Sequence, residues 1–298
     1  MSDPLAPQEA LEALRDGLRR LGRVVVAFSG GADSAFLAWV ARDTLGPAGA
    51  LCVTAVSPSL GPAEEADCRA LAQEWGLRWV GVATAEMDDP AYVANGADRC
   101  GRCKTALMDV LAPLARREEA TVVLGVNLDD LGDHRPGQEA SASLGARFPL
   151  VEAGFTKAAV RDCSRRLGLR TWDKPAAACL ASRIPYGTPV TLERLGSVAR
   201  AEAALRALGF ADLRVRHHGD VARVEVPEAD LPLAVERRRE VVAAVRAAGY
   251  AFVALDLEGF RSGSLNRVLA GAPPVAAGPA PSAAPDGAPR LAPAWSER

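Results

Sequence analysis

The sequence predicts an α/β protein, in which a doubly wound parallel sheet is followed by a small α+β domain. Between residues 24 and 167, short apolar segments alternate with segments of helical periodicity. Continuous apolar segments are typical of strands buried on both faces, and strands separated by helices form parallel sheets. After about residue 185 a hairpin replaces this alternation. The predicted domains are residues 1–185 and 186–270, followed by a tail at 271–298.

Each element of the first domain is predicted from its local pattern. Leu11, Leu14 and Leu18 recur at helical spacing, which predicts an amphipathic helix over residues 8–21. Four short apolar segments predict the strands, and the segments between them have the period of helices. The strands are expected at residues 24–28, 50–56, 77–82 and 121–126. The later helices are expected at residues 33–45, 62–75, 104–117 and 157–167.

The second domain is predicted to hold a hairpin between two helices. Residues 212–217 and 221–226 alternate like paired strands, with Gly219-Asp220 at the turn. The flanking helices are expected at 192–208 and 229–248, and a last strand at 250–256. Residues 271–298 are rich in Pro, Ala and Gly and have no periodicity, which predicts a disordered tail.

The amino-acid composition argues against some classes of function. The chain has 298 residues, a formal net charge of -2 and a sequence pI of about 6.0, so no basic excess indicates a nucleic-acid partner. It lacks an apolar stretch of about eighteen residues, so we expect no membrane partner and a cytoplasmic location. In that compartment the six cysteines are expected as thiols or metal ligands. Nearly all basic residues are arginines, and lysine occurs only at Lys104, Lys157 and Lys174.

A glycine-rich turn follows the first predicted strand. Glycines let the backbone point N–H groups at an anion, and the next helix adds its positive N-terminal end. The carboxylate of Asp33 repels phosphate. Its presence in an anion-binding turn is explained if it caps the helix or if Mg²⁺ lies between it and the phosphates. A tight turn before a capped helix is the alternative. The motifs GxxxxGK[ST] and GxGxxG are absent. The turn comprises Ser29, Gly30, Gly31, Ala32, Asp33 and Ser34.

This SGGxDS turn resembles the pyrophosphate-binding loop of the N-type ATP pyrophosphatases (PP-loop enzymes), which have an adenine nucleotide alpha hydrolase-like fold. The resemblance implies that ATP is cleaved between its α- and β-phosphates, with Mg²⁺ as a cofactor and Asp33 as a catalytic residue. Ser57 and the segment 125–130 follow the second and fourth strands, where open α/β sheets bind ligands. The implied ATP-binding residues are Ser29, Gly30, Gly31, Asp33, Ser34, Ser57, Gly125, Asp130 and Arg135.

Four later segments resemble the LarE family, and with the loop the resemblance covers about residues 8–269. They are HRPGQEA at 134–140, ACLASRIPYG at 178–187, RVR at 214–216 and LDLEGFRSG at 255–263. The resemblance implies an ATP-dependent sulfurtransferase of nickel-pincer nucleotide biosynthesis that forms AMP and pyrophosphate. It implies a small-molecule nucleotide substrate, pyridinium-3,5-biscarboxylic acid mononucleotide, whose carboxylate is adenylated and becomes a thiocarboxylate. It also implies a homo-oligomer and transient contact with other proteins of that biosynthesis.

Such a substrate carries carboxylates and a phosphate and needs cationic partners. Arg214 and Arg216 alternate on a predicted strand and point the same way, a fork suited to a bidentate anion. By resemblance, Glu202 lines the same site, directly or through a metal. An ordinary surface ion pair is the alternative for each, and it is at least as well supported for Arg261 and Glu225. The predicted substrate-binding residues are Ser182, Arg183, Glu202, Arg214 and Arg216.

Three cysteines indicate where the sulfur comes from. Cys100 and Cys103 form a CxxC ahead of a predicted helix, and Cys179 is far downstream. Together they can hold a [4Fe-4S] cluster with one open iron for an extra sulfide. Structural Zn²⁺ and a redox-active CxxC disulfide are the alternatives. The predicted metal ligands are Cys100, Cys103 and Cys179, of which Cys179 is also catalytic.

The LarE resemblance bears on these alternatives. LarE-like proteins of the sacrificial kind carry their reactive cysteine where this chain has Ala178, and the other kind carries three cysteines and a cluster. This sequence matches the three-cysteine kind, and the neighbouring Cys179 leaves the sacrificial route open. The remaining cysteines are predicted to be small buried residues: Cys52, Cys68 and Cys163.

Three other functions fit part of the sequence. An amidating enzyme of the NAD synthetase type shares the loop and the adenylation but needs no cysteine trio. A tRNA thiolation enzyme requires an RNA-binding surface, which the acidic balance disfavours. A nucleotide-sensing or scaffold protein with a vestigial loop is disfavoured because the loop keeps both Asp33 and Ser34.

Overall fold

The computed structural model describes residues 6–132, 141–175 and 178–261. All of them belong to one compact unit, Met1–Ser262. The HRPGQEA segment with Arg135, and the predicted tail at 271–298, lie outside the described residues. The domain boundary at residue 185 stays a prediction. Within the described ranges, no helix is long and apolar enough to cross a membrane.

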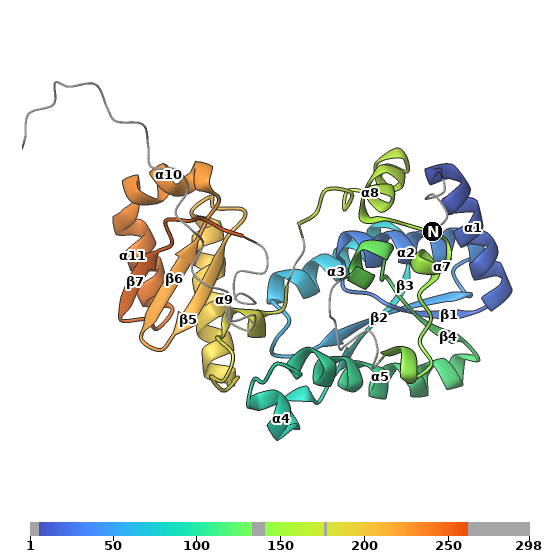
Figure 1. Ribbon diagram of the computed structural model, residues 1–298, viewed down its shortest axis with the longest axis horizontal. Helices are drawn as coiled ribbons and strands as arrows, with labels where there is room; N and C mark the ends of the chain where they lie inside the picture. Colours follow the sequence, from blue (N-terminus) through green and yellow to red (C-terminus); the bar gives the residue numbers. More distant parts are fainter. Residues whose placement is uncertain (1–5, 133–140, 176–177, 262–298) are drawn as a thin grey trace, which may run out of the picture. The chain divides into compact units, whose positions relative to one another are not determined.

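A four-stranded parallel sheet forms in the order β3-β2-β1-β4 (Figure 1). β1 is fully buried over its three valines, and Val24 pairs with Ala50 of β2 on one side and with Thr121 of β4 on the other. The predicted α/β fold class with a parallel sheet is therefore confirmed. The strands are β1 Val24–Ala27, β2 Ala50–Val56, β3 Arg78–Ala83 and β4 Thr121–Leu124.

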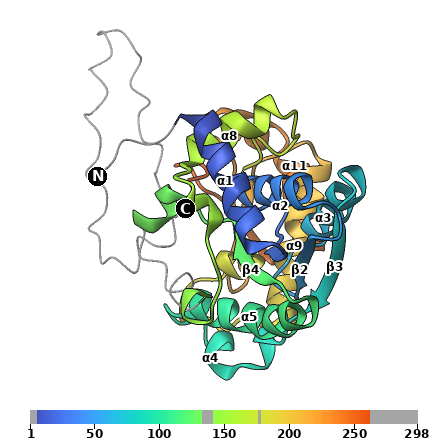
Figure 2. The same cartoon turned by 90° about the vertical axis from the view of Figure 1, so that its right-hand side faces the viewer.

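Helices cover both faces of this sheet, as Figure 2 shows for α1 and α2 on one face and α5 on the other. Successive strand residues point to opposite faces. Val26 therefore packs with Leu14 and Phe36 in one core, and Val25 packs with Met108 in the other. The helices of the first face are α1 Pro7–Leu21, α2 Ala32–Leu45, α3 Pro62–Glu74 and α8 Lys157–Arg166; α5 is Arg99–Glu118.

The strand order places a switch point between β1 and β4. After β1 the chain passes to β2 and β3 on one side, and then returns to add β4 on the other side. In open α/β sheets, ligands bind beyond the carboxyl ends of the strands at such a point. The loops after β1 and β4 both carry predicted site residues, so the topology alone makes them neighbours.

Helix α5 begins earlier than the sequence predicted. It starts at Arg99 rather than at residue 104, so Cys100 and Cys103 lie inside its first two turns and not ahead of it. The apolar face of this helix begins only at Leu107, and the polar turn before it therefore carries no periodicity that could reveal a helix. Residues three apart lie on one helical face, so the two cysteines are neighbours.

A second, mixed sheet of three strands follows in the order β5-β6-β7. The predicted hairpin is confirmed, because β5 and β6 are antiparallel, and β7 runs parallel to β6. Val215, Val224 and Phe210 belong to the core between this sheet and its helices. The elements are α9 Leu192–Ala207, β5 Arg214–His218, β6 Val221–Glu225 and β7 Phe252–Leu255.

The single helix predicted over residues 229–248 is wrong. The chain forms a 3₁₀ turn η4 (Glu228–Asp230), then α10 (Leu231–Glu236) and α11 (Arg238–Ala247). Pro232 lacks an N–H group and so begins α10 instead of lying inside a longer helix. The other short elements are η1 Glu86–Asp88, α4 Pro90–Val93, η2 Leu128–Gly132, α7 Pro149–Glu152 and η3 Leu180–Arg183.

Candidate active site

The loop after β1 has the geometry of an anion-binding turn. Gly30 has a φ of +69°, in the left-handed region, and a Cβ there would lie 2.9 Å from Sγ of Cys68. Gly31 is the N-cap of α2 and brings no side chain to the cap. The N–H of Ser29 donates to Oγ of Ser34 (3.2 Å), which donates to the carbonyl of Gly31 (3.2 Å). The Ser34 hydroxyl therefore fixes a loop whose N–H groups have no helical acceptor.

Asp33 does not cap α2, so that alternative is wrong. Its Oδ1 accepts a hydrogen bond of 3.1 Å from Nδ2 of Asn127, in the loop after β4. The N–H of Asn127 donates to Oδ2 of Asp130 (3.2 Å). Burial raises the pKa of Asp33; the Asn127 hydrogen bond acts against this shift, and the charge of Asp130 adds to it. A half-buried carboxyl beside a second carboxylate suits a divalent cation.

Gly125 lets these two loops meet. A Cβ at this position would lie 2.8 Å from the N and Cα atoms of Ser34 and 2.9 Å from the carbonyl carbon of Asp33. These are backbone atoms, which cannot rotate out of the way as the end of a side chain does. The structure thus brings the loop 29–34 and the segment 125–130 together, as the sequence predicted from the strand ends.

The end of β2 contacts the segment that carries Cys179. Ser57 directly follows β2, and its hydroxyl lies 2.9 Å from that of Ser59. The Ser59 hydroxyl donates to Oε1 of the buried Glu86 (3.3 Å), and its carbonyl accepts from the N–H of Leu180 (2.8 Å). Leu180 begins η3, so Cys179 is held beside a predicted nucleotide-binding loop.

Of the three predicted sulfur ligands, Cys179 and Cys100 lie near enough to Cys103 to affect its pKa. Burial, followed by the charge of nearby Cys179, raises the pKa of Cys103 to about 11, and Cys100 contributes to the same shift. Cys100 and Cys179 are exposed, and Cys103 is half-buried. Across the described residues, no group of three or more His, Cys, Asp or Glu side chains is placed to hold a metal ion. The predicted burial of the other three is confirmed: Cys52, Cys68 and Cys163.

A buried cation accompanies these thiols. Arg99 is only 4% exposed, and its Nη1 donates to Oδ1 of Asn95 (2.6 Å) and to the carbonyl of Ala181 (2.9 Å). Its Nη2 lies 3.9 Å from Sγ of Cys100. No carboxylate of the described chain lies within ion-pair distance of Arg99. Burial acts to lower the pKa of Arg99, but its nearness to Cys179 and Cys100 raises it.

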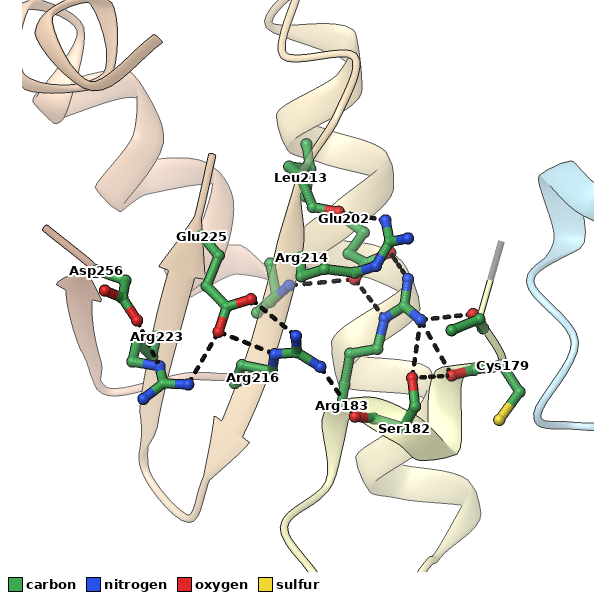
Figure 3. Close-up of polar contacts among 12 residues, drawn as sticks. Cys179, Ser182, Arg183, Glu202, Leu213, Arg214, Arg216, Arg223, Glu225 and Asp256 are labelled. Atoms are coloured by element: carbon green, nitrogen blue, oxygen red, sulfur yellow. Dashed lines mark hydrogen bonds and ion pairs between the residues drawn. The ribbon is translucent and has the colours of Figure 1, made fainter. Parts of the chain in front are cut away.

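Two buried arginine–glutamate pairs hold predicted substrate residues (Figure 3). Arg183 donates from Nε and Nη2 to the two carboxylate oxygens of Glu202 (2.8 and 3.1 Å). Arg216 donates in the same bidentate way to Glu225 (3.0 and 2.8 Å). Glu225 is fully buried, so the surface ion pair considered for it is wrong. Arg261, by contrast, forms an exposed pair with Glu258.

These pairs are connected to the backbone around Cys179. Nη1 of Arg183 donates to the carbonyls of Ala178 (2.5 Å) and Cys179 (3.0 Å). The Ser182 hydroxyl also donates to the Cys179 carbonyl (2.7 Å), and Arg216 Nη1 donates to the Ser182 carbonyl (3.0 Å). Burial, and then the charge of Arg183, lower the pKa of Arg214 to about 10. A carboxylate or phosphate bound at Arg214 would relieve this repulsion.

Sequence reasoning missed three residues of this site. Asn127 and Arg99 were not predicted, because a single buried amide or guanidinium carries no local pattern. Lys174 was noticed only as one of three lysines, and its Nζ donates to the carbonyl of Gly30 (3.2 Å) in the loop after β1. Each has one partner that is far away in the sequence: Asp33 for Asn127, Ala181 for Arg99 and Gly30 for Lys174.

The parallel sheet and the loop after β1 define an α/β protein of the PP-loop type. No family model matches the chain. It is 46% identical over 265 residues to an uncharacterized protein of Synechocystis, covering 88% of this chain and 98% of that protein. It is 38% identical over 253 residues to a pyridinium-3,5-bisthiocarboxylic acid mononucleotide synthase of Lactiplantibacillus plantarum, covering 85% and 92%. The chain therefore belongs to the LarE family, as its motifs predicted.

A further relative is an uncharacterized protein of Methanocaldococcus jannaschii. It is 24% identical over 241 residues, which are 80% of this chain and 91% of that protein. All three relatives match over most of their own length, so the similarity extends through both sheets and is not limited to the loop after β1.

Proposed function

We propose that this chain is an ATP-dependent sulfurtransferase that converts pyridinium-3,5-biscarboxylic acid mononucleotide to a thiocarboxylate. Its similarity to a pyridinium-3,5-bisthiocarboxylic acid mononucleotide synthase supports the substrate. The observation that carries the proposal is the 2.8 Å hydrogen bond between the Leu180 N–H and the Ser59 carbonyl. It ties the backbone next to Cys179 to the loop at the end of β2, which supports a role for this cysteine beside the proposed nucleotide site.

The first step activates a carboxylate. A substrate carboxylate oxygen attacks the α-phosphorus of ATP, the bond from the α-phosphorus to the bridging oxygen breaks, and pyrophosphate leaves with the electron pair. The N–H groups of the loop after β1 bind that pyrophosphate. Asp33, and Asp130 beside it, hold the Mg²⁺ that accompanies ATP, which relieves the repulsion between the two carboxylates. Ser57 contacts the adenine, and Gly125 keeps the space beside Ser34 open.

The second step replaces AMP by sulfur. A sulfur nucleophile adds to the acyl carbon, and AMP leaves with the electron pair of the broken carbon–oxygen bond. Arg214, Arg216 and Arg183 bind the phosphate and the second carboxylate of the substrate. Ser182 and Glu202 keep these guanidinium groups in place, since each hydrogen-bonds or pairs with one of them.

We propose that Cys100, Cys103 and Cys179 are the ligands of an iron–sulfur cluster. When bound, a [4Fe-4S] cluster with one open iron supplies a sulfide for transfer. Three thiols and the carboxylate-free guanidinium of Arg99 are a donor set and a counter-charge suited to an anionic cluster. Consumption of the Cys179 sulfur itself is the alternative.

Anaerobic incubation with ATP, Mg²⁺, sulfide and the pyridinium dicarboxylate mononucleotide tests this function. We expect AMP and pyrophosphate in equal amounts, a product with one oxygen replaced by sulfur, and unchanged protein mass. A protein lighter by one H₂S would favour sacrifice of a cysteine over the cluster. An amide product formed with ammonia would favour amidation, and absence of AMP with all these substrates would overturn the enzyme proposal.

A further inference from the structure

Lys174 connects the loop after β1 to helix α3. It lies between α8 and η3, and its side chain is 19% exposed. Its ammonium group donates to the carbonyl of Gly30 (3.2 Å), to Oε2 of Glu64 (3.0 Å) and to Oδ2 of Asp67 (2.7 Å). An ammonium group has three N–H donors, so all of them are engaged. The loop carbonyl is therefore fixed by a charged hydrogen bond from a residue 144 positions away.

The choice of lysine at this position fits its contacts. The chain has 35 basic residues, and only three of them are lysines. Lysine presents its donors around one nitrogen atom, whereas the donors of arginine lie in the plane of an extended fork. The ammonium group of a lysine therefore satisfies three acceptors that converge on one point. Although burial acts to lower the pKa of Lys174, its hydrogen bonds to Asp67 and Glu64 raise it, so the ammonium form persists at neutral pH.

The contact with Gly30 also sets the direction of the next N–H group. The described chain has no cis peptide bond, and in a trans peptide the C=O of one residue and the N–H of the next point in opposite directions. Since the Gly30 carbonyl points at Lys174, the N–H of Gly31 points away from Lys174, Glu64 and Asp67. In the described chain no acceptor contacts that N–H, which precedes the N-terminus of α2, where anions bind.

We propose that Lys174 is a positioning residue for pyrophosphate: its hydrogen bond to the Gly30 carbonyl turns the Gly31 N–H toward the departing phosphates. The inference rests on the proposed function in one respect, namely that the loop after β1 binds pyrophosphate. Lys174 also neutralises Glu64 and Asp67, whose charges would otherwise repel that anion. Its own donors are occupied, so it acts through the backbone and not by contact with phosphate.

Calorimetric titration of the full chain with inorganic pyrophosphate, and separately with AMP, tests this role. Lys174→Met is expected to bind pyrophosphate about tenfold more weakly, the effect of one lost charged hydrogen bond, and to bind AMP as the wild type does. Arg170→Met is the matched control. Arg170 also pairs with Asp67 (2.7 Å) and with Glu74 (2.8 Å), but it does not touch the loop, so its loss is expected to leave both affinities unchanged.

Salt separates positioning from long-range attraction. A loss caused only by the missing charge would disappear at high salt, whereas a misdirected N–H group weakens binding at any salt concentration. Should Lys174→Met fail to fold, Lys174→Arg keeps a charge for Glu64 and Asp67, and we expect the same selective loss of pyrophosphate affinity. Two results would overturn the inference. One is a folded variant that loses affinity for AMP as well as for pyrophosphate, and the other is a loss of pyrophosphate affinity that occurs only at low salt.

The outcome for the wild type distinguishes this inference from the proposed function. If the wild type binds pyrophosphate and the Lys174 variants bind it equally well, the inference alone is overturned. If the wild type itself binds neither pyrophosphate nor ATP, the ATP-dependent activation is overturned as well, and the inference is overturned with it.

Discussion

Asn127 donates a hydrogen bond of 3.1 Å from its Nδ2 to Oδ1 of Asp33. The amide can do so in only one orientation, because its Oδ1 accepts from the N–H groups of Asp129 (3.0 Å) and Asp130 (3.3 Å). Asn127 is buried, so these hydrogen bonds are shielded from water. The loop after β4 thus orients the carboxyl group in the first turn of α2, on which the proposed activation step depends.

Asp33→Asn is expected to abolish activity without lowering stability. Burial raises the pKa of Asp33, so its ionised form opposes folding; this cost is absent below the unfolded pKa and complete above the raised one. At neutral pH the variant should unfold at the same or a higher temperature. Pyrophosphate release should fall on the order of a hundredfold or more. Calorimetry and a pyrophosphate assay measure both effects, and a less stable variant would contradict this account.

Gly125→Ala is expected to destabilise the protein by about 1–3 kcal/mol, the range for overpacking. Its methyl group would lie 2.8 Å from backbone atoms of Ser34 and push the two loops apart. Affinity for ATP should fall with stability. Gly17→Ala in α1 is the control, because its nearest neighbour would be 3.7 Å away and alanine favours helix. Urea unfolding compares the two, and equal stability of both variants would contradict the prediction.

Glu202→Gln is expected to cost about 3 kcal/mol at pH 7, as for one partner of a buried ion pair. Burial alone would raise the pKa of Glu202, but Arg183 and the other hydrogen bonds hold it below 4.5. The stabilisation is therefore present above pH 4.5 and is lost as the pH falls through the lower, folded pKa.

Unfolding measurements at several pH values test the direction of this pH dependence. Urea unfolding of the wild type and of Glu202→Gln should differ most near pH 7, and the difference should shrink progressively below pH 4.5. Glu240→Gln, which breaks an exposed pair with Arg237, should leave the unfolding midpoint unchanged. A difference between wild type and Glu202→Gln that grows on acidification would show that the carboxylate is not stabilised by its arginine partners.

Cys103 is expected to react slowly with iodoacetamide in metal-free protein. Burial and the neighbouring Cys179 raise its pKa to about 11, and only the thiolate is the nucleophile. Its alkylation rate should rise by about tenfold for each pH unit from 8 to 10. The exposed Cys100 should react first. Peptide mass spectrometry follows both sites, and a flat pH profile for Cys103 would refute the shift.

Colour tests the proposed cluster. Protein purified without oxygen should be brown, and Cys103→Ala should remove the absorbance that thiolate-ligated iron gives in the visible region. Cys163→Ser is the control, since Cys163 is buried in the core between α1 and α8 and is far from this site in the fold. Colourless wild-type protein containing one zinc per chain would overturn the cluster proposal.

Local patterns were sufficient for the parallel sheet and for the loop after β1. These predictions used patterns that each lie within a short segment of sequence: the valines of β1, the helical spacing of Leu11, Leu14 and Leu18, and two adjacent glycines. Hydrophobic periodicity and turn chemistry act over a few residues, so they can be recognised without knowledge of the fold. The same reasoning failed at the start of α5, where no apolar period marks the helix, and at Pro232, where a proline begins a new helix.

The sequence by itself determined which segments become strands and helices, which loop can bind phosphate, and which family the motifs resemble. Only the tertiary structure decided that Asn127 orients Asp33, that Arg183 and Arg216 each hold a buried glutamate, and that Lys174 reaches Gly30 across 144 positions. Burying a polar group is costly unless it finds a partner, and the fold brings such partners together from distant segments. That pairing leaves no local trace in the order of the residues.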